Sequence, residues 1–224
     1  MWIVIDEVSL MPKQKKEIDD LDIGILYVLH HFGKATAYDI SNVLNQARGT
    51  ISKRLKELVD QGILEEAEVD ISTGKLRKIY KSPSIELIKD LLFRYYKNFG
   101  AEIDEEFFGE QLEISDEAIN SYAEDMLDYW LSDDELLKLR NEGMNILDLI
   151  REKTKRKDAT ALDIATLEFT GLIEVKNKIA RLSEKGKNVM TEKLVNSIKE
   201  DLKLLKDLSR EDYNKLLNEI CNNK

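Results

Sequence analysis

The sequence predicts a mainly α-helical protein that carries small β-hairpins. Only two of the 224 residues are proline, and 35% are charged, a composition that favours helices with solvated faces. Hydrophobic residues make up 42% of the chain, which is enough to bury a core. In most segments they recur every three or four positions, and two pairs of short strand-like runs are each joined by a tight turn.

The first helix is expected from about Asp20 to His31, and Gly33 marks its end. A second helix spans Ala37–Leu44, and Thr36 with Asp39 has the spacing of a capping box at its start. A third helix runs from about Thr50 to Asp60. Its hydrophobic positions, Ile51, Leu55 and Leu58, fall on one face, which predicts a buried stripe.

Two strand-like runs, 63–71 and 75–81, follow the third helix and are joined by a loop that contains Gly74. They predict a β-hairpin. Next comes an amphipathic helix over about 84–98, after which Gly100 opens a new segment.

The second half repeats this order less clearly. A helix over about 115–131 presents Ile119, Tyr122, Met126 and Tyr129 on one stripe, and further helices are expected over 133–141 and 145–155. Asp158 is the expected cap of another helix, which ends at Gly171. The remaining elements are a small hairpin (172–175 and 179–182), a long helix that begins after Ser183, and a final helix from Ser209 to about Ile220.

The charge is unevenly distributed along the chain. The net charge is −10, yet residues 1–100 balance 15 basic against 15 acidic side chains. Residues 101–132 hold 11 acids and no base, so this one segment carries the imbalance. The rest of the chain can therefore hold local basic patches.

Several classes of function are disfavoured by composition. Cys221 is the only cysteine and His30 and His31 the only histidines, which excludes an internal disulfide and argues against a metal site. No phosphate-binding loop, nucleophile motif or spaced carboxylate motif is present, so we expect neither an enzyme nor a cofactor. No run of 18 apolar residues exists, so we expect no membrane span and a cytoplasmic location.

Three short helices followed by a hairpin are the element order of the winged helix-turn-helix. Residues 50–64, Thr-Ile-Ser-Lys-Arg-Leu-Lys-Glu-Leu-Val-Asp-Gln-Gly-Ile-Leu, resemble the recognition helix and following strand of MarR/PadR-like transcriptional regulators, with an archaeal appearance. Residues 36–44 resemble their first helix-turn-helix helix. The resemblance covers about residues 17–82, and residues 205–217 are similar to the helices through which such proteins dimerise. It implies a regulator that binds double-stranded DNA as a homodimer.

The charges of this region agree with that expectation. The segments 46–56 and 71–81 each hold four bases and no acid. A helix fits the major groove of DNA, and a basic hairpin can contact neighbouring phosphates. An ordinary solvated face is the alternative explanation of these bases. The candidate groove contacts are Gln46, Arg48, Thr50, Ser52, Lys53, Arg54 and Lys56, and the candidate phosphate contacts are Lys75, Arg77, Lys78 and Lys81.

The sequence of the second winged-helix-like unit, residues 133–190, predicts a different role. The helix that corresponds to the recognition helix, within 159–170, contains Asp163 and Glu168 and no base, so it would repel phosphate. This unit is read either as a protein-contact or dimerisation domain or as an unrelated helical bundle. The acidic segment is read as a solvated linker, as a contact for a basic partner, or as a stretch that covers the basic face and competes with DNA.

These observations divide the chain into five parts. Residues 1–16 form a strand or arm, 17–100 the DNA-binding domain with its following helix, 101–132 an acidic helical linker, 133–190 a second winged-helix-like domain, and 191–224 the dimerisation helices. The alternative function is a winged-helix protein-interaction module in a replication, partition or transcription assembly.

Overall fold

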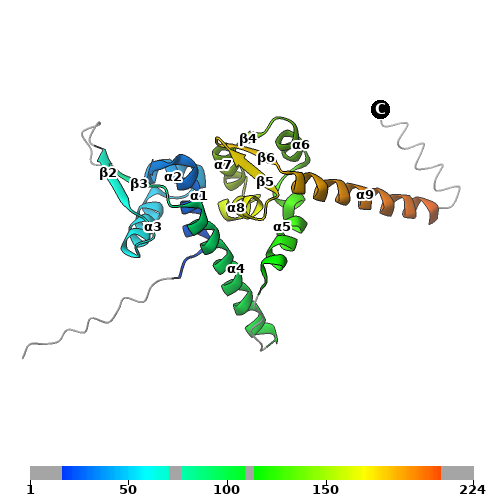
Figure 1. Cartoon of the computed structure of the whole chain (residues 1–224), viewed down its shortest axis with the longest axis horizontal. Helices are drawn as coiled ribbons and strands as arrows, with labels where there is room; N and C mark the ends of the chain where they lie inside the picture. Colours follow the sequence, from blue (N-terminus) through cyan, green and yellow to red (C-terminus); the bar gives the residue numbers. More distant parts are fainter. Residues whose placement is uncertain (1–16, 71–76, 109–113, 208–224) are drawn as a thin grey trace, which may run out of the picture.

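The computed structural model describes residues 17–70, 77–108 and 114–207, and within these ranges it contains nine helices and six short strands. Side chains are described for these residues except 68–70, 77, 99–108, 201–202 and 204–207. The mainly helical fold with small antiparallel sheets is therefore confirmed (Figure 1). No helix of the described ranges combines the length and the apolar character that a membrane span requires.

The elements between residues 20 and 81, called the first unit, follow the predicted order of helices and strands with one addition. The addition is β1, a three-residue strand that pairs with β3, so that the sheet has the order β1-β3-β2. Three residues are too few to show an alternating pattern, which is why the sequence did not predict this strand. The elements are α1 (Asp20–Phe32), β1 (Lys34–Thr36), α2 (Ala37–Leu44), α3 (Arg48–Asp60), β2 (Glu66–Asp70) and β3 (Arg77–Lys81).

Helix α2 begins where its capping box predicts. The Thr36 side chain accepts the backbone N–H of Asp39, and the Asp39 carboxylate accepts the N–H of Thr36 at 2.9 Å. Asn45 ends the helix in the left-handed conformation, which starts the turn into α3. Helix α1 is buried on nearly all sides, since Ile23, Ile25 and every residue from Leu26 to Leu29 are inaccessible to solvent.

The described parts of the acidic segment are mostly helical and differ from the prediction in two ways. Helix α4 (Ile85–Phe108) continues through Gly100, so this glycine does not end the preceding helix. Helix α5 (Asp116–Trp130) buries Ile119, Ala123 and Leu127. The predicted stripe was wrong by part of a turn: Tyr122 and Tyr129 are exposed, and the buried face instead continues through Ala123 and Leu127 to Trp130.

Residues 133–182 repeat the element order of the first unit. Their sheet has the order β4-β6-β5, which matches β1-β3-β2. One predicted cap was wrong: Thr160 caps α8 through a capping box with Asp163, whereas the carboxylate of Asp158 lies 3.6 Å from the ammonium of Lys153. The elements are α6 (Asp133–Asn141), β4 (Met144–Asn145), α7 (Ile146–Arg156), α8 (Ala161–Phe169), β5 (Ile173–Lys176), β6 (Ile179–Leu182) and α9 (Glu184–Asp207).

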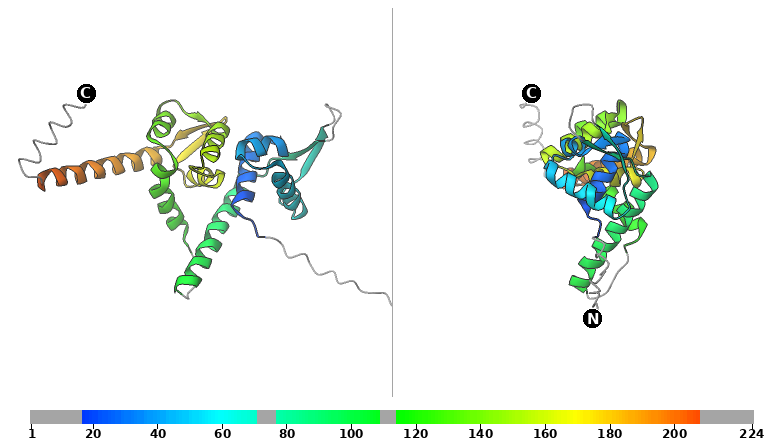
Figure 2. Two further views of the ribbon diagram at one scale, coloured as in Figure 1. Left: turned by 180° about the vertical axis from the view of Figure 1, so that it is seen from behind. Right: turned by 90° about the vertical axis from the view of Figure 1, so that its left-hand side faces the viewer.

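The two units share one core, in which α8 packs on α1 and α7 packs on α2 (Figures 1 and 2). Gly24 permits the close approach of α1 and α8, because a Cβ there would lie 3.2 Å from the Cβ of Ala161. The Tyr27 hydroxyl donates to the Glu168 carboxylate at 2.6 Å. The long helix α9 projects away from this core (Figure 2), and the predicted final helix from Ser209 lies outside the described residues.

The start of α9 provides a stability test. A Cβ on Gly186 would overlap the backbone carbonyl oxygen of Leu172, whereas a Cβ on Gly49 of α3 would meet no atom within 4 Å. We expect Gly186→Ala to lower the free energy of unfolding by roughly 1–3 kcal/mol, the usual cost of overpacking. Gly49→Ala should instead raise it by about 0.5–1 kcal/mol through helix propensity. Urea unfolding of both variants measures the difference, and equal effects would contradict the packing described.

Candidate nucleic-acid interface

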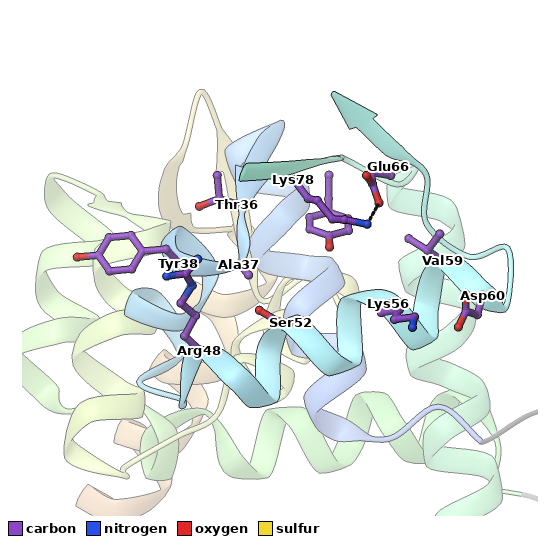
Figure 3. Close-up of a pocket in the computed structure, with 11 residues that line it drawn as sticks. Thr36, Ala37, Tyr38, Arg48, Ser52, Lys56, Val59, Asp60, Glu66 and Lys78 are labelled. Carbon is purple, nitrogen blue, oxygen red and sulfur yellow. Dashed lines mark hydrogen bonds and ion pairs between the residues drawn. The ribbon is translucent and has the colours of Figure 1, made fainter. Parts of the chain in front are cut away.

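A groove on the first unit lies between α3 and the wing, the name used here for strands β2 and β3. It has a volume of about 760 Å³ and opens toward solvent (Figure 3). Helix α3 forms one wall, the wing the other, and the start of α2 closes one end. The polar and charged residues that line it are Thr36, Tyr38, Arg48, Ser52, Lys56, Asp60, Glu66, Lys78 and Tyr80.

The sequence of α3 explains why its cations face this groove. Ile51, Leu55 and Leu58 are buried against the core, which fixes the rotation of the helix. Arg48, Ser52 and Lys56 are four residues apart, so they form one row along the helix surface, and all three are exposed. Four predicted site residues, these three and Lys78, are thus brought together from two elements (Figure 3).

Two acidic residues, Glu66 and Asp60, lower the net positive charge of the groove. Lys78 binds Glu66 across the wing at 2.7 Å, and this hydrogen bond raises the pKa of Lys78. Asp60 lies near the far end of α3. An exposed ion pair contributes little to stability. A phosphate can therefore replace Glu66 as the partner of the Lys78 ammonium with little loss of folding free energy.

Three further predicted residues are exposed beside the groove. Thr50 and Lys53 lie on α3, and the Lys53 side chain is 78% exposed and 3.9 Å from Glu57. Lys81 is exposed at the base of the wing. Since side chains alternate along a strand, Lys81 faces the side of β3 opposite to Lys78 and lies outside the groove. Lys75 and the side chain of Arg77 lie outside the described residues.

Arg54 corrects the prediction. Its side chain is only 17% exposed, because α3 is rotated so that this residue faces the start of α1. The guanidinium pairs with Asp19 and lies 3.5 Å from carboxylate oxygens of both Asp22 and Glu57. Arg54 therefore joins α3 to α1 and is not available to read a base.

The cluster around Arg54 contains an unusual carboxyl group. Asp22 is buried, and burial together with the neighbouring carboxylate of Asp19 raises the pKa of Asp22 to about 7. Its Oδ1 atom is buried without a hydrogen bond. The guanidinium of Arg54 thus offsets part of the cost of placing two carboxylates at the start of α1.

Gln46 also lies away from the groove. It lines a second cavity of about 610 Å³ between the two units, together with Arg54, Asn45, Thr154 and Lys157. Gln46 is exposed and does not line the groove between α3 and the wing, so its base contact stays a prediction. The turn that leads from α2 into α3 orients it this way.

Tyr38 is a groove residue that the sequence analysis missed. It is 53% exposed on the first turn of α2 and lines the end of the groove (Figure 3). The capping box at Thr36 is the sequence signal from which the outward position of Tyr38 could have been predicted. It fixes the start of α2, and Ile40, Val43 and Leu44 then fix its buried face, which leaves Tyr38 outward.

The counterpart of α3 in the second unit is buried. Ala161, Ile164 and Ala165 of α8 are inaccessible or nearly so, and the helix packs on α1, α4, α5 and α7. Glu168 accepts the hydrogen bond of Tyr27 and lies 3.4 Å from Nε2 of the buried His31. Helix α8 thus holds the units together. No group of three metal-ligating side chains occurs among the described residues.

The described part of the acidic segment does not cover the groove. Helix α5 packs on α4 and α8. Its acids pair with bases of neighbouring helices: Asp116 with Lys97 at 3.0 Å, Glu124 with Lys185 at 2.8 Å, and Asp128 with Lys193. The interpretation in which this segment masks the basic face is therefore not supported by the residues described.

Comparison with known proteins finds similarity within the first unit. Residues 17–70 match the model of the MarR family. The matched residues contain α1, β1, α2, α3 and β2, so the similarity to the MarR family covers the helix-turn-helix and the first strand of the wing. An uncharacterised HTH-type transcriptional regulator of Pyrococcus abyssi is 33% identical to the chain over 82 residues, which are 35% of this chain and 51% of the relative. Another, from Pyrococcus furiosus, is 40% identical over 60 residues, 27% of this chain and 40% of the relative.

The chain therefore spans about half the length of the first relative and less of the second. No solved structure matches the chain significantly. The matched residues end within the wing and leave the second unit without a counterpart in the family match.

The changed assignment of Arg54 gives a direct prediction. Arg54→Ala removes the partner of two carboxylates at the start of α1, so we expect it to lower the free energy of unfolding by roughly 2–4 kcal/mol. Lys53→Ala, one residue away and exposed, should change it by less than about 0.5 kcal/mol. Chemical denaturation distinguishes the two variants. A stability loss as small for Arg54→Ala as for Lys53→Ala would show that the guanidinium is not a structural link.

Proposed function

We propose that the protein is a transcriptional regulator that binds double-stranded DNA with α3 in the major groove and the wing on neighbouring phosphates. The observation that carries this proposal is the row Arg48, Ser52 and Lys56, which faces Lys78 across one open groove. The MarR family match and the two HTH-type relatives support the same function.

The residue types suit the two kinds of contact. Arg48 can bind guanine through two parallel hydrogen bonds, and the hydroxyls of Ser52 and Thr50 can bind base edges. Lys53, Lys56, Lys78 and Lys81 supply ammonium groups for phosphates, which provide most of the affinity. The hydroxyl of Tyr38 adds a donor at the end of the groove, where a phosphate would lie beside the first turn of α2.

A homodimer completes this proposal. Helix α9 exposes Leu194, Val195 and Ile198, with exposed fractions of 62%, 42% and 48%. Leu194 and Ile198 are four residues apart and form one apolar stripe on a projecting helix. We infer that a second copy of the chain covers it. A two-fold dimer would present two α3 helices to half-sites about 34 Å apart.

The alternative is a module that docks other proteins within an assembly on DNA, in which DNA affinity is incidental. The same apolar stripe on α9 favours this alternative, since a different protein can also cover it. Duplex binding by the whole chain separates the two functions. The N-terminal unit alone is unsuitable for this test, because α1 buries part of its surface against α8.

The groove residues are tested by replacing two cations whose side chains form no ion pair within the described part of the chain. Arg48→Ala combined with Lys56→Ala should weaken binding to duplex DNA through the loss of a base contact and a phosphate contact. The lost phosphate contact of Lys56 should lower the slope of log affinity against log salt by about 0.9. Titration of a duplex at several salt concentrations measures both quantities. The matched control is Lys199→Ala with Lys203→Ala on α9. An unchanged slope in the groove variant would refute the proposed surface.

The dimer is tested on the apolar stripe. Leu194→Asp with Ile198→Asp places two charges on it, which should convert a dimer into a monomer and leave the unfolding temperature nearly unchanged, because both side chains are exposed. Sedimentation velocity gives the mass of each form. Wild-type protein that sediments as a monomer at micromolar concentration, or a variant that remains dimeric, would contradict this use of α9.

A further inference from the structure

We propose that Lys155, Arg156 and Lys157, at the end of α7, form a second contact with the DNA backbone, on the second unit and beside the start of α3. These three residues are called the α7 basic patch. The inference rests on the proposed function, and it extends the DNA-binding surface beyond the residues that match the MarR family.

The patch is held next to the helix-turn-helix. The Thr154 hydroxyl donates to the backbone carbonyl of Val43 in α2 at 2.9 Å, which ties the end of α7 to the end of α2. Lys157 lines the cavity between the units together with Asn45 and Gln46, the residues that lead into α3. In Figure 1, α7 lies beside α2 on the side away from the wing. The wing and the patch therefore lie on opposite sides of the helix-turn-helix.

The charged side chains of the patch are exposed and have no ion-pair partner among the described residues. None of its three side chains forms an ion pair within the described part of the chain, although the neighbouring Arg151 pairs with Asp148 at 2.8 Å and Lys153 with Glu135 and Asp158. Four acids lie near the patch: Glu152 precedes Arg156 by four residues on α7, and Asp20, Asp158 and Asp163 line the same cavity as Lys157. Asp158 lies 3.6 Å from the ammonium of Lys153, and Asp163 caps α8. The three cations of the patch form no ion pair with these acids, which lower its net positive charge without pairing with it.

The backbone conformation keeps these cations at the surface. Lys157 adopts a left-handed conformation, with φ of 63°, and its N–H donates to the carbonyl of Lys153 to end α7. Glycine or asparagine is the residue that such a position usually favours. A lysine here accepts some backbone strain and adds a charge next to α2.

The second unit thereby gains a role consistent with its buried helix α8. It cannot insert α8 into DNA, because that helix packs on α1. It can hold cations against the phosphates that flank the groove read by α3, and such contacts add affinity and fix register without reading sequence. The competing explanation is that the three cations only stabilise the C-terminal end of α7 through its dipole.

The test uses the full-length chain and the triple variant Lys155→Gln, Arg156→Gln, Lys157→Asn, in which asparagine suits the left-handed position. The matched control, Lys138→Gln with Lys199→Gln and Lys203→Gln, removes the same charge from α6 and α9. Binding of a fluorescent duplex is measured from low to physiological salt. We expect the patch variant to lower the log–log salt slope by about 2.7 and the control to leave it unchanged.

The outcomes separate the inference from the proposed function. A patch variant that matches the control, while Arg48→Ala with Lys56→Ala still weakens binding, overturns the patch alone. Wild-type protein that does not retain duplex DNA overturns both. If the triple variant unfolds below the wild-type temperature, the pair Lys155→Gln and Arg156→Gln leaves the Lys157 bend intact. That pair should lower the slope by about 1.8, and an unchanged slope would again overturn the patch.

Discussion

The contact between α1 and α8 is the constraint on which the rest of the structure depends. Helix α1 is buried on nearly every side, so it serves both units as a shared core element. Gly24 lets α8 approach closely, and the hydrogen bond from Tyr27 to Glu168 satisfies a phenol that is otherwise inaccessible. Because α3 packs on α1 as well, the same helix fixes the recognition helix relative to the second unit. The outward face of α3 is left open.

Two similar sets of elements thus carry different surfaces. Helix α3 exposes a row of cationic residues to solvent. Helix α8 instead buries the corresponding face in the core, where Glu168 accepts a hydrogen bond from Tyr27. Charge decides this division. A basic helix is costly to bury and suits phosphate, while a helix rich in alanine, leucine and isoleucine gains free energy from burial. Arg54 is the exception within α3: its side chain is largely withdrawn from solvent and pairs with Asp19 and Asp22.

Local signals predicted the helices of the first unit, whereas contacts between distant residues limited the site prediction. The capping box of Thr36 and Asp39 and the stripe of Ile51, Leu55 and Leu58 act within a few residues, so a sequence displays them directly. The pairing of Arg54 with Asp19 spans 35 residues, and helical periodicity cannot distinguish the flank of a helix from its exposed centre. Nor could the sequence predict that Gln46 lines a cavity with residues of the second unit, since this depends on packing between residues far apart in the chain. On α5, exposed aromatic residues were indistinguishable by pattern from buried ones.

Amide hydrogen exchange of the whole chain, with and without a duplex of mixed sequence at low salt, tests the central claim most directly. The account predicts slower exchange in α3 and at the wing on binding, with α5 and the distal part of α9 unchanged. Protection confined to α5 or α9, or no change in α3 while the duplex is bound, would contradict it.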